Sequence, residues 1–440
     1  MRKALTITKM TLLINLRKGT LWAIAFIVAV FSSVAFYMAK SDGSLVNELE
    51  IRISYSYGIT YSILSLMIIA LACFTVRSQI DAKNLHLVTS MPLERKWIFA
   101  GQAFALIIIA FIAEIILLGT IFTNSWFFSK GYEEAERQVA YDRYFNTRRE
   151  VRPYYIKKRQ VALNYAKEQG IDLTELDGHE WFYFYHDALR QETLIEAGKN
   201  KIWQFDLNDV PYEGETVQLI YKFQKGNKRD PIQGFFELTA PGYNIYFKKS
   251  IQAHQYVEDV IEIPINFIPD NGRFEVKFTN TGKNSVVVNR SGLIFSYQKG
   301  SLWENINKCF LSQTLHLSVS SLVGLCAGIG LTFSVASFMV IMLYLIATGH
   351  PVFQLVMVDY EFTIAPTFMD GVIHNIMSVA IWLTKGLKAP ELVSNISSGL
   401  NIGWDYLITS WMPAVLVYGL IASALGSFML TRKELDKVQT

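Results

Sequence analysis

Long apolar runs occupy the first quarter and the last third of the chain, whereas residues 130–307 have the mixed character of a water-soluble segment. A helix needs about 20 mostly apolar residues to cross the hydrocarbon core of a bilayer. The apolar runs that qualify lie at 21–38, 58–76, 97–122, 311–348 and 406–430. The run at 311–348 is too long for one crossing, and Gly328 and Gly330 within it permit a tight reversal. The pattern predicts an α-helical polytopic membrane protein with about six transmembrane helices.

The water-soluble segment between the third and fourth predicted spans changes its pattern part-way. Residues 131–198 pair opposite charges at helical spacing, which predicts a helical part. Residues 200–298 form short alternating runs separated by Gly, Pro, Asn and Asp, which predicts an antiparallel β-sandwich. Within the run 272–280, Phe274, Val276 and Phe278 are expected to share one face. The insertion is therefore predicted to be an α+β domain.

Basic residues mark one side of the predicted spans. Basic residues occur before the first span, in the segment between the second and third spans, and after the sixth span. In the segment between the first and second spans, acidic residues outnumber basic ones. Positively charged loops tend to stay in the cytoplasm, so both termini are predicted to be cytoplasmic and the insertion extracytoplasmic. The expected location is the plasma (inner) membrane. A single tilted helix in place of spans four and five would contradict the basic C-terminus.

These patterns together divide the chain into five segments. They are a cytoplasmic amphipathic helix at 1–19, spans one to three at 20–123 with a short cytoplasmic helix at about 78–91, an extracytoplasmic domain at 124–310, spans four to six at 311–431 with external interfacial helices at about 366–404, and a cytoplasmic tail at 432–440.

The first 19 residues are amphipathic as a helix. Leucines share one side, at Leu5, Leu12, Leu13 and Leu16, and polar residues share the other, at Thr8, Thr11, Asn15 and Lys18. Lys9 falls on the leucine side, so the separation is moderate. This pattern is typical of a helix that lies in the membrane interface.

The cytoplasmic stretch 77–97, "RSQIDAKNLHLVTSMPLERKW", is longer than a turn between two spans requires. Its apolar residues Ile80, Leu87, Val88 and Met91 fall on one rough helical face, which Asn84 interrupts. Ser90, Pro92 and Glu94 then have the character of a new helix start. Two interpretations stay open: the stretch is a helix to which a soluble partner binds, or it is a loop that lies on lipid headgroups.

The order of these features resembles the permease subunit of ABC transporters of the type-2 exporter family. The matching stretches are "MRKALTITKMTLLINLRKG", "RSQIDAKNLHLVTSMPLERKWIFAGQAFA" and "SSGLNIGWDYLITSWMPAVLVYGLIASALGSFMLTRKEL". Within the second stretch, Ser90-Met91-Pro92, Arg95-Lys96 and Gly101-Gln102 match the family's coupling region. Arg432-Lys433-Glu434 matches its usual ending. The resemblance covers a little over half of the chain and rests on loose motifs in a characteristic order.

The resemblance implies partners that the chain does not contain. It implies a separate ABC ATPase subunit that binds ATP and Mg²⁺, and a second permease copy or a related permease. It also implies that the helix at about 78–91 docks on the ATPase, through Ile80, Asn84, Leu87, Val88 and Met91. The first helix would touch the ATPase as well.

Composition and motifs exclude several other classes of function. The charged fraction of 18% is below the roughly 25% of ordinary soluble domains, and the net charge of +3 is too small to indicate nucleic acid as a partner. The chain has no G-x-x-x-x-G-K-[ST], because asparagine follows both Gly-Lys pairs. It also has no H-E-x-x-H and no G-x-S-x-G. No catalytic, cofactor or metal site is predicted in this chain, so any ATPase activity is expected in the partner.

Five other residues are candidates for a functional role. Glu114 is an acid deep inside the third predicted span, where a charge costs roughly 3 kcal/mol. It is predicted to line a pathway or an interface, or, alternatively, to be protonated and hydrogen bonded to a neighbouring helix. Tyr243 and Tyr246 are candidates for a ligand platform on the sandwich, or for its core. Asp370 and His374 could meet a substrate outside the membrane or anchor at headgroups.

Two functions compete on this basis. The first is a permease driven by a separate ATPase, for export or for mechanical work on the extracytoplasmic domain. The second is a membrane-anchored protein whose sandwich binds a ligand, such as a carbohydrate, or signals without transport. No polar run recognised in the predicted spans specifies a substrate class or a direction of transport.

Overall fold

The computed structural model divides the chain into two compact units. The helical unit contains the described residues of 1–145, 301–357 and 372–440, and the sheet unit those of 146–300 and 358–371. The residues outside the described part are 1, 41–44, 82–94, 173–177, 208–215, 226–230, 241, 243–245, 350–351, 354–367, 389–391 and 433–440.

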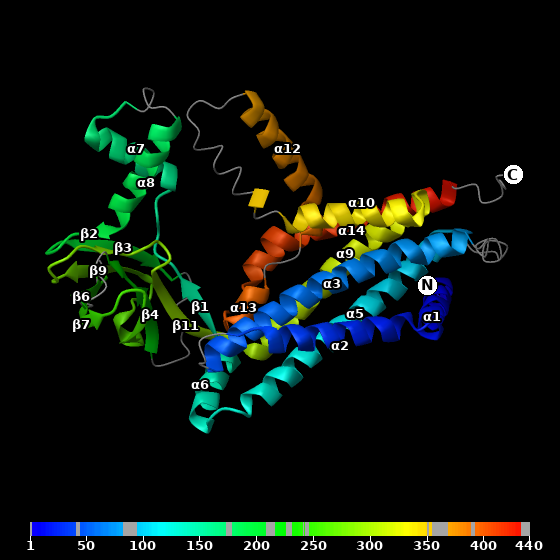
Figure 1. The fold of residues 1–440 in the computed structure, drawn as a ribbon, viewed down its shortest axis with the longest axis horizontal. Coiled ribbons are helices and arrows are strands. Elements are labelled where there is room, and N and C mark those ends of the chain that lie inside the picture. The colour runs from blue at the N-terminus through cyan, green and yellow to red at the C-terminus, as the bar shows by residue number, and fades with distance from the viewer. Residues whose placement is uncertain are drawn as a thin grey trace. The chain divides into compact units, whose positions relative to one another are not determined.

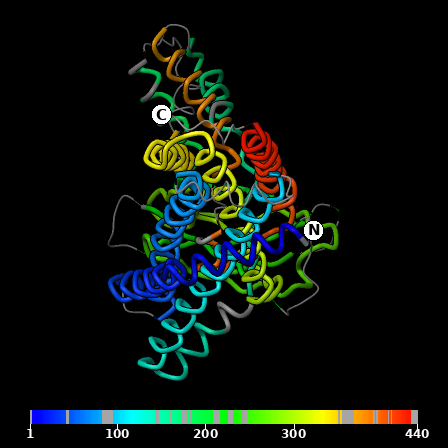
Figure 2. The backbone as a smooth tube through the Cα atoms, turned by 90° about the vertical axis from the view of Figure 1, so that its right-hand side faces the viewer, coloured from blue at the N-terminus to red at the C-terminus, as the bar shows by residue number. Residues whose placement is uncertain are grey.

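The helical unit is built around the long helices α2, α3, α5 and α9, which run alongside one another (Figure 1). Its helices are α1 Arg2–Arg17, α2 Thr20–Met38, α3 Leu45–Asp81, α5 Arg95–Ser129, α6 Glu134–Phe145, α9 Leu302–Gly330, α10 Phe333–Thr348, α12 Phe368–Thr384, α13 Val393–Ser397 and α14 Met412–Arg432. Pairs α3–α9, α9–α14 and α2–α3 make the most extensive contacts. α1 lies across the end of this bundle, at a steep angle to α2 (Figures 1 and 2).

Five helical segments are long and apolar enough to cross a membrane, among the residues described. They are α2, α3, α5, α9 and Leu407–Arg432, with 19, 37, 35, 29 and 26 residues. α9 ends at Gly330 and α10 begins at Phe333, which is where the glycines predicted a break. α10 is apolar but has 16 residues, so it is about 24 Å long, short of a core about 30 Å thick. Five of the six predicted spans therefore have a helix of spanning length.

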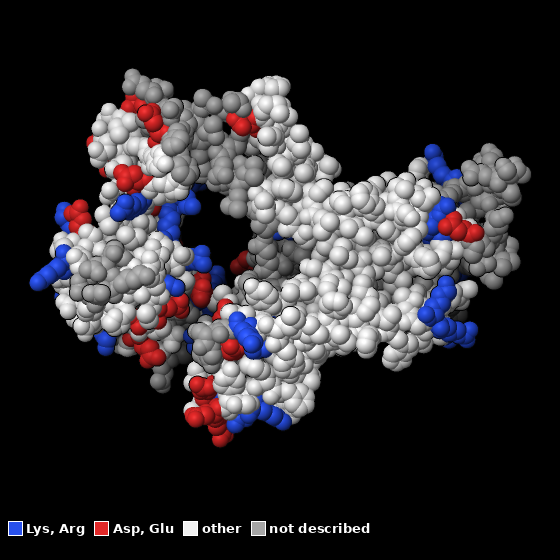
Figure 3. Space-filling view, viewed as in Figure 1, with Lys and Arg blue, Asp and Glu red and all other residues white. Residues whose placement is uncertain are grey.

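On one face of the helical unit, the surface between its two ends carries few charged side chains. On the face shown in Figure 3, Lys, Arg, Asp and Glu gather near α6 and at the end where α1 lies, with an uncharged band between them. Large apolar side chains are exposed on the helices of this unit, for example Phe26 on α2, Ile108 on α5 and Leu420 on α14. An exposed apolar band of this extent is compatible with a membrane-embedded unit.

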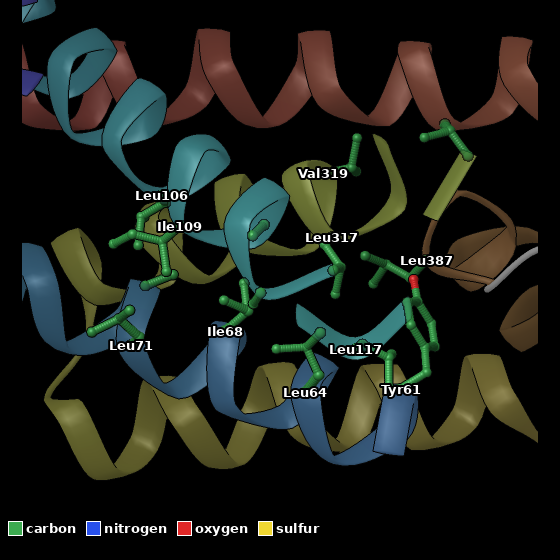
Figure 4. Packing of buried hydrophobic residues seen from close by; sticks show 14 of the residues in the cluster. Tyr61, Leu64, Ile68, Leu71, Leu106, Ile109, Leu117, Leu317, Val319 and Leu387 are labelled. Atoms are coloured by element: carbon green, nitrogen blue, oxygen red, sulfur yellow. The ribbon is translucent and has the colours of Figure 1, made fainter. Parts of the chain in front are cut away.

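The core of the helical unit joins α3, α5 and α9. Figure 4 shows Leu64, Ile68 and Leu71 from α3 packed against buried leucines and isoleucines of α5 and against Leu317 of α9. Gly324 and Gly328 of α9 both lie directly against α3. A Cβ atom on Gly328 would lie 2.5 Å from the carbonyl oxygen of Cys73, which is shorter than any ordinary contact. Glycine at this position therefore permits the two backbones to approach each other.

α1 packs with its polar side inward. Thr8, Thr11 and Asn15 are buried, and the Thr8 hydroxyl donates a 3.0 Å hydrogen bond to the Gly101 carbonyl of α5. Most of the leucine side points outward, with Leu5 66% exposed. A helix in water would bury its leucines instead, so exposed leucines on α1 are compatible with an apolar surrounding; the interfacial position of residues 1–19 stays a prediction.

The sheet unit contains three sheets, with strand orders β1-β11-β4-β8, β2-β10-β5 and β3-β9-β6-β7. Its strands are β1 Asn146–Val151, β2 Leu194–Ile195, β3 Asn200–Asp206, β4 Thr216–Lys222, β5 Gln224–Lys225, β6 Ile232–Thr239, β7 Tyr246–Ala253, β8 Glu258–Pro264, β9 Arg273–Asn280, β10 Val286–Val287 and β11 Leu293–Ser301. The pairs whose register is defined are antiparallel, for example Phe205 opposite Phe274 and Leu219 opposite Ile261. The predicted antiparallel sheets are present.

The two four-stranded sheets pack face to face around an aromatic core. Phe274, Val276 and Phe278 of β9 are all buried on one face, as their alternation predicts. Phe295 of β11 contacts the ring of Phe274 across the core, with centroids 4.9 Å apart and planes at 70°. Edge-to-face contacts of this kind add to the burial energy of the rings. The core therefore has the two-layer arrangement of a sandwich.

The segment predicted as helical, 131–198, is not helical throughout. It contains α6, α7 Lys158–Gln169 and α8 Gly178–Thr193, but also the strand β1. β1 adds to the edge of a sheet beside β11, and the Thr147 hydroxyl donates a 2.9 Å hydrogen bond to the Lys299 carbonyl. Its three consecutive charged residues, Arg148, Arg149 and Glu150, suit an edge strand as well as a helix, so charge alone does not distinguish the two.

Candidate functional site

α9 places polar residues, most of them on one side of the helix, inside the apolar helical unit. The polar residues of α9 that are buried are Asn305, Lys308, Ser312, Gln313, Thr314, His316, Ser318, Ser320 and Ser321. Each buried polar group costs free energy unless it is hydrogen bonded, and more so away from water. We call the central part of this stripe, together with the α3 and α5 side chains that face it, the polar cluster: Tyr57, Tyr61, Glu114, Cys309, Gln313 and His316.

Glu114 of α5 lies at the centre of the polar cluster and is 0% exposed. The Tyr57 hydroxyl on α3 donates a hydrogen bond to its Oε1 atom. The same hydroxyl is 3.6 Å from the Cys309 sulfur on α9, so one group links three helices. The second carboxyl oxygen, Oε2, is buried and has no hydrogen-bond partner among the described residues. This oxygen is therefore available for a hydrogen bond inside the unit.

His316 continues the cluster toward the 3-10 turn η2, Lys385–Leu387. Its Nε2 lies 2.9 Å from the Leu387 carbonyl, which can only accept, so Nε2 carries the proton. Its Nδ1 lies 2.6 Å from the Tyr61 hydroxyl, and a neutral imidazole accepts that hydroxyl proton. The rings of Tyr57 and Tyr61 are stacked with an 8° interplanar angle. The ring of Tyr344 on α10 lies 6.3 Å from that of His316.

Gln313 is the second incomplete group of the cluster. Its side chain is fully buried, and neither amide atom has a hydrogen-bond partner in the described part of the chain. It lies one helical turn from both Cys309 and His316 on α9. A buried carboxyl oxygen and a buried amide without partners are uncommon in folded proteins, and such groups usually meet water or a ligand. The cluster can therefore hold a water molecule or a polar group of a bound molecule.

The N-terminal part of the α9 stripe is, in contrast, fully paired. The Lys308 amine donates a 2.8 Å hydrogen bond to the Ile402 carbonyl and forms a 2.6 Å ion pair with Glu304. The Asn305 amide donates to the Leu400 carbonyl and its oxygen accepts from the Ile402 amide. These contacts fix residues 400–402 on α9, so this end of the stripe has a structural explanation.

Among the residues described, no group of three or more His, Cys, Asp and Glu side chains could hold a metal ion.

The residues predicted from the sequence lie in different places. Ile80 is on α3, half-buried and packed against the helical core, whereas Asn84, Leu87, Val88 and Met91 lie outside the described residues, as does Tyr243. Asp370 and His374 are one turn apart on α12. Glu114 joins Tyr57 and Cys309 in the polar cluster, where it accepts a hydrogen bond from α3; its protonation and its role in a pathway or an interface both stay predictions. Since its side chain has no exposed surface in the single chain, contact with a second copy would require rearrangement.

Tyr246 is half-exposed on β7, and its hydroxyl is engaged within the sheet. It donates a 2.7 Å hydrogen bond to Glu237 of β6, whose carboxylate also pairs with Lys248 and Lys277. The Tyr246 hydrogen bond and the two lysines hold the pKa of Glu237 below its usual range. The ring of Tyr246 therefore faces solvent while its hydroxyl helps to join two strands.

We expect the stability of the sheet unit to depend on pH through Glu237. A carboxyl whose pKa is lowered by folding contributes stability above its unfolded pKa, near 4.3, and loses it as the pH falls through the folded value. Glu237→Gln should therefore lower resistance to proteolysis at pH 7, and the difference from the natural chain should shrink below about pH 4. The exposed Glu258→Gln is the control, and an unchanged difference at both pH values would contradict the expectation.

Sequence reasoning missed most of the polar cluster. The predicted fourth span began at residue 311, which excluded Asn305, Lys308 and Cys309 from it. The signal was present as spacing: Cys309, Gln313, His316 and Ser320 follow one another at intervals of three and four residues. Tyr57 and Tyr61 have the same spacing on α3. That these faces meet Glu114 depends on tertiary packing.

Comparisons with protein-family models, with curated proteins and with solved structures find no match to this chain.

We expect removal of the Glu114 carboxyl to destabilise the helical unit. Glu114→Gln keeps an acceptor for the Tyr57 hydroxyl, whereas Glu114→Leu leaves that hydroxyl without its partner, which costs about 1–3 kcal/mol. The loss should appear as a lower midpoint of thermal unfolding for the full chain in detergent. Equal midpoints for Glu114→Gln and Glu114→Leu would contradict this expectation.

Proposed function

We propose that the chain is the membrane-spanning permease subunit of a transporter that is driven by a separate ATPase, similar to the type-2 exporters among ABC transporters. The observation that supports this best is the polar cluster. A protein that is only anchored needs apolar helices, since buried polar groups raise the cost of membrane insertion. A carboxyl oxygen and an amide left without partners inside the bundle are instead expected where a polar molecule passes or where helices rearrange.

The charges at one end of the helical unit support the proposed orientation. Arg17, Lys18, Arg95 and Arg432 lie at the ends of α1, α5 and α14, and Arg95 donates a 3.2 Å hydrogen bond to the Thr431 carbonyl. Positively charged ends favour the cytoplasmic side of a membrane. In the proposed topology, both termini and segment 82–94 are therefore cytoplasmic, and the sheet unit is extracytoplasmic.

The proposed coupling runs through segment 82–94 and the end of α3. The chain contains no phosphate-binding loop, so in this proposal another protein hydrolyses the ATP. Ile80 lies one residue before the end of α3 at Asp81, and the predicted contact residues Asn84, Leu87, Val88 and Met91 follow in the sequence. A partner bound there would act on α3 and α5 together. The substrate and the direction of transport follow from neither the helices nor the cluster.

Co-purification of a partner ATPase is the test of this proposal. The tagged full chain, purified in mild detergent from its native membranes, is expected to retain a P-loop ATPase that mass spectrometry identifies. Leu87→Asp or Val88→Asp should remove it, whereas Leu85→Asp, which is off the predicted face, should not. If no ATPase is retained, or if all three variants retain it equally, the chain is better explained as a membrane-anchored ligand-binding protein.

The predicted side of the membrane has a separate test. A cysteine introduced at Asn84 is expected to react with an impermeant thiol reagent only after the cells are permeabilised. Reaction in intact cells would reverse the proposed topology and exclude a cytoplasmic ATPase at this segment.

A further inference from the structure

An apolar groove lies where α1, α2 and α5 meet. It has a volume of about 190 Å³, and all of the residues that line it are apolar. Leu16 contributes from α1, Leu21 and Trp22 from α2, and Ile109 and Ile112 from α5. The groove forms because Gly19, with φ of 73°, turns the chain sharply between α1 and α2. Trp22 is 70% exposed at its opening.

Positive charge lies beside this groove. Arg17 and Lys18 directly follow the lining residue Leu16, and both are exposed. α1 contains no acidic residue, and among the described residues no carboxylate pairs with Arg17 or Lys18. The Lys18 amine lies 5.6 Å from the ring centre of Phe74. An apolar groove that ends beside two cations has the chemistry of an amphiphile with an anionic headgroup.

We propose that this groove binds one acyl chain of an anionic glycerophospholipid, whose phosphate is held by Arg17 and Lys18. The outward leucines of α1 place the turn at Gly19, between α1 and α2, at the depth where acyl chains meet headgroups. Basic residues at that depth favour anionic lipids over zwitterionic ones. A second copy of the chain fits less well, because it would bring α1, which has basic residues and no acidic ones, against another surface of the same sign. The inference needs the helical unit to lie in a membrane, but it does not need an ATPase or transport.

Trp22 provides a direct measurement. The full chain is reconstituted in phosphatidylcholine bilayers that contain increasing fractions of phosphatidylglycerol with brominated acyl chains, which quench tryptophan on contact. The chain has nine tryptophans, so the signal of Trp22 is the difference between the natural chain and Trp22→Phe. We expect half-maximal quenching of Trp22 at a several-fold lower fraction of brominated phosphatidylglycerol than of brominated phosphatidylcholine.

Variants separate the headgroup from the acyl chain. Each charge removed, by Arg17→Gln or Lys18→Gln, should weaken the preference for the anionic lipid about fivefold, whereas Lys9→Gln, two turns away on α1, should not. Ala25→Phe, which fills the groove and keeps both charges, should reduce quenching by either lipid. Equal quenching by the two lipids, or a preference unchanged by Arg17→Gln and Lys18→Gln, would overturn the inference. These outcomes are independent of ATPase retention, so failure here leaves the proposed function untouched.

Discussion

Replacing Gly328 by valine is expected to prevent the helical unit from folding stably. The new Cβ would lie 2.5 Å from the Cys73 carbonyl oxygen and 3.1 Å from its Cα, both of which are backbone atoms of α3. Ordinary overpacking costs about 1–3 kcal/mol, and a clash with backbone has no side chain to move aside, so we expect more than about 3 kcal/mol here. The full-length variant should aggregate on extraction into mild detergent, as size-exclusion chromatography would detect.

The matched control is Gly119→Val on α5. No atom lies within 4 Å of a Cβ built on Gly119, so the same substitution has room there. We expect Gly119→Val to elute as the natural chain does. A Gly328→Val protein that is as stable as the Gly119→Val protein would show that α3 and α9 do not pack as described.

Replacing Phe278 by alanine is expected to destabilise the sheet unit by about 3–5 kcal/mol, the usual cost of removing a large buried aromatic. Phe278 is 0% exposed and its ring lies 4.8 Å from that of Phe223 and 4.9 Å from that of Phe236. Because Gly234 on the neighbouring strand lies directly against the Phe278 ring, alanine would leave a cavity that this glycine cannot fill. Limited proteolysis of the full chain should then cut within residues 146–300 at much lower protease concentration.

Ile202→Ala on the adjacent strand β3 serves for comparison. Ile202 is half-exposed, so its truncation should change stability by less than about 0.5 kcal/mol. Similar protease sensitivity in the Phe278→Ala and Ile202→Ala proteins would contradict the sandwich core described above.

The elements that were predictable from the sequence are those with a strong local period. The apolar runs correspond to α2, α3, α5, α9 and α14, and the break at Gly330 follows from local glycine chemistry. The alternation of Phe274, Val276 and Phe278 is equally local, because neighbouring strand residues face opposite sides. Such patterns need no knowledge of partners elsewhere in the chain.

What could not be predicted depends on residues distant in the sequence. The edge strand β1 exists because β11, about 150 residues later in the chain, supplies its partner. Glu114 was recognised as unusual from its position in an apolar run, but Tyr57 and Cys309 come from two other helices and carry no sign of it. In α1, the sequence pattern showed a leucine side and a polar side. It did not show that the polar side, with Thr8, Thr11 and Asn15, is the one that packs inward.

α3 is one uninterrupted helix that contains Tyr57 and Tyr61 near its middle and Ile80 at its end. The 19 residues from Tyr61 to Ile80 span about 29 Å at 1.5 Å per residue. A rotation of this rod about its axis at Ile80 would turn both tyrosines by the same angle and withdraw their hydroxyls from Glu114 and His316. Those hydrogen bonds would add to the packing of α3 on α2, α5 and α9 in resisting such a rotation, so contacts in the interior and motion at the far end of the helix are mechanically linked.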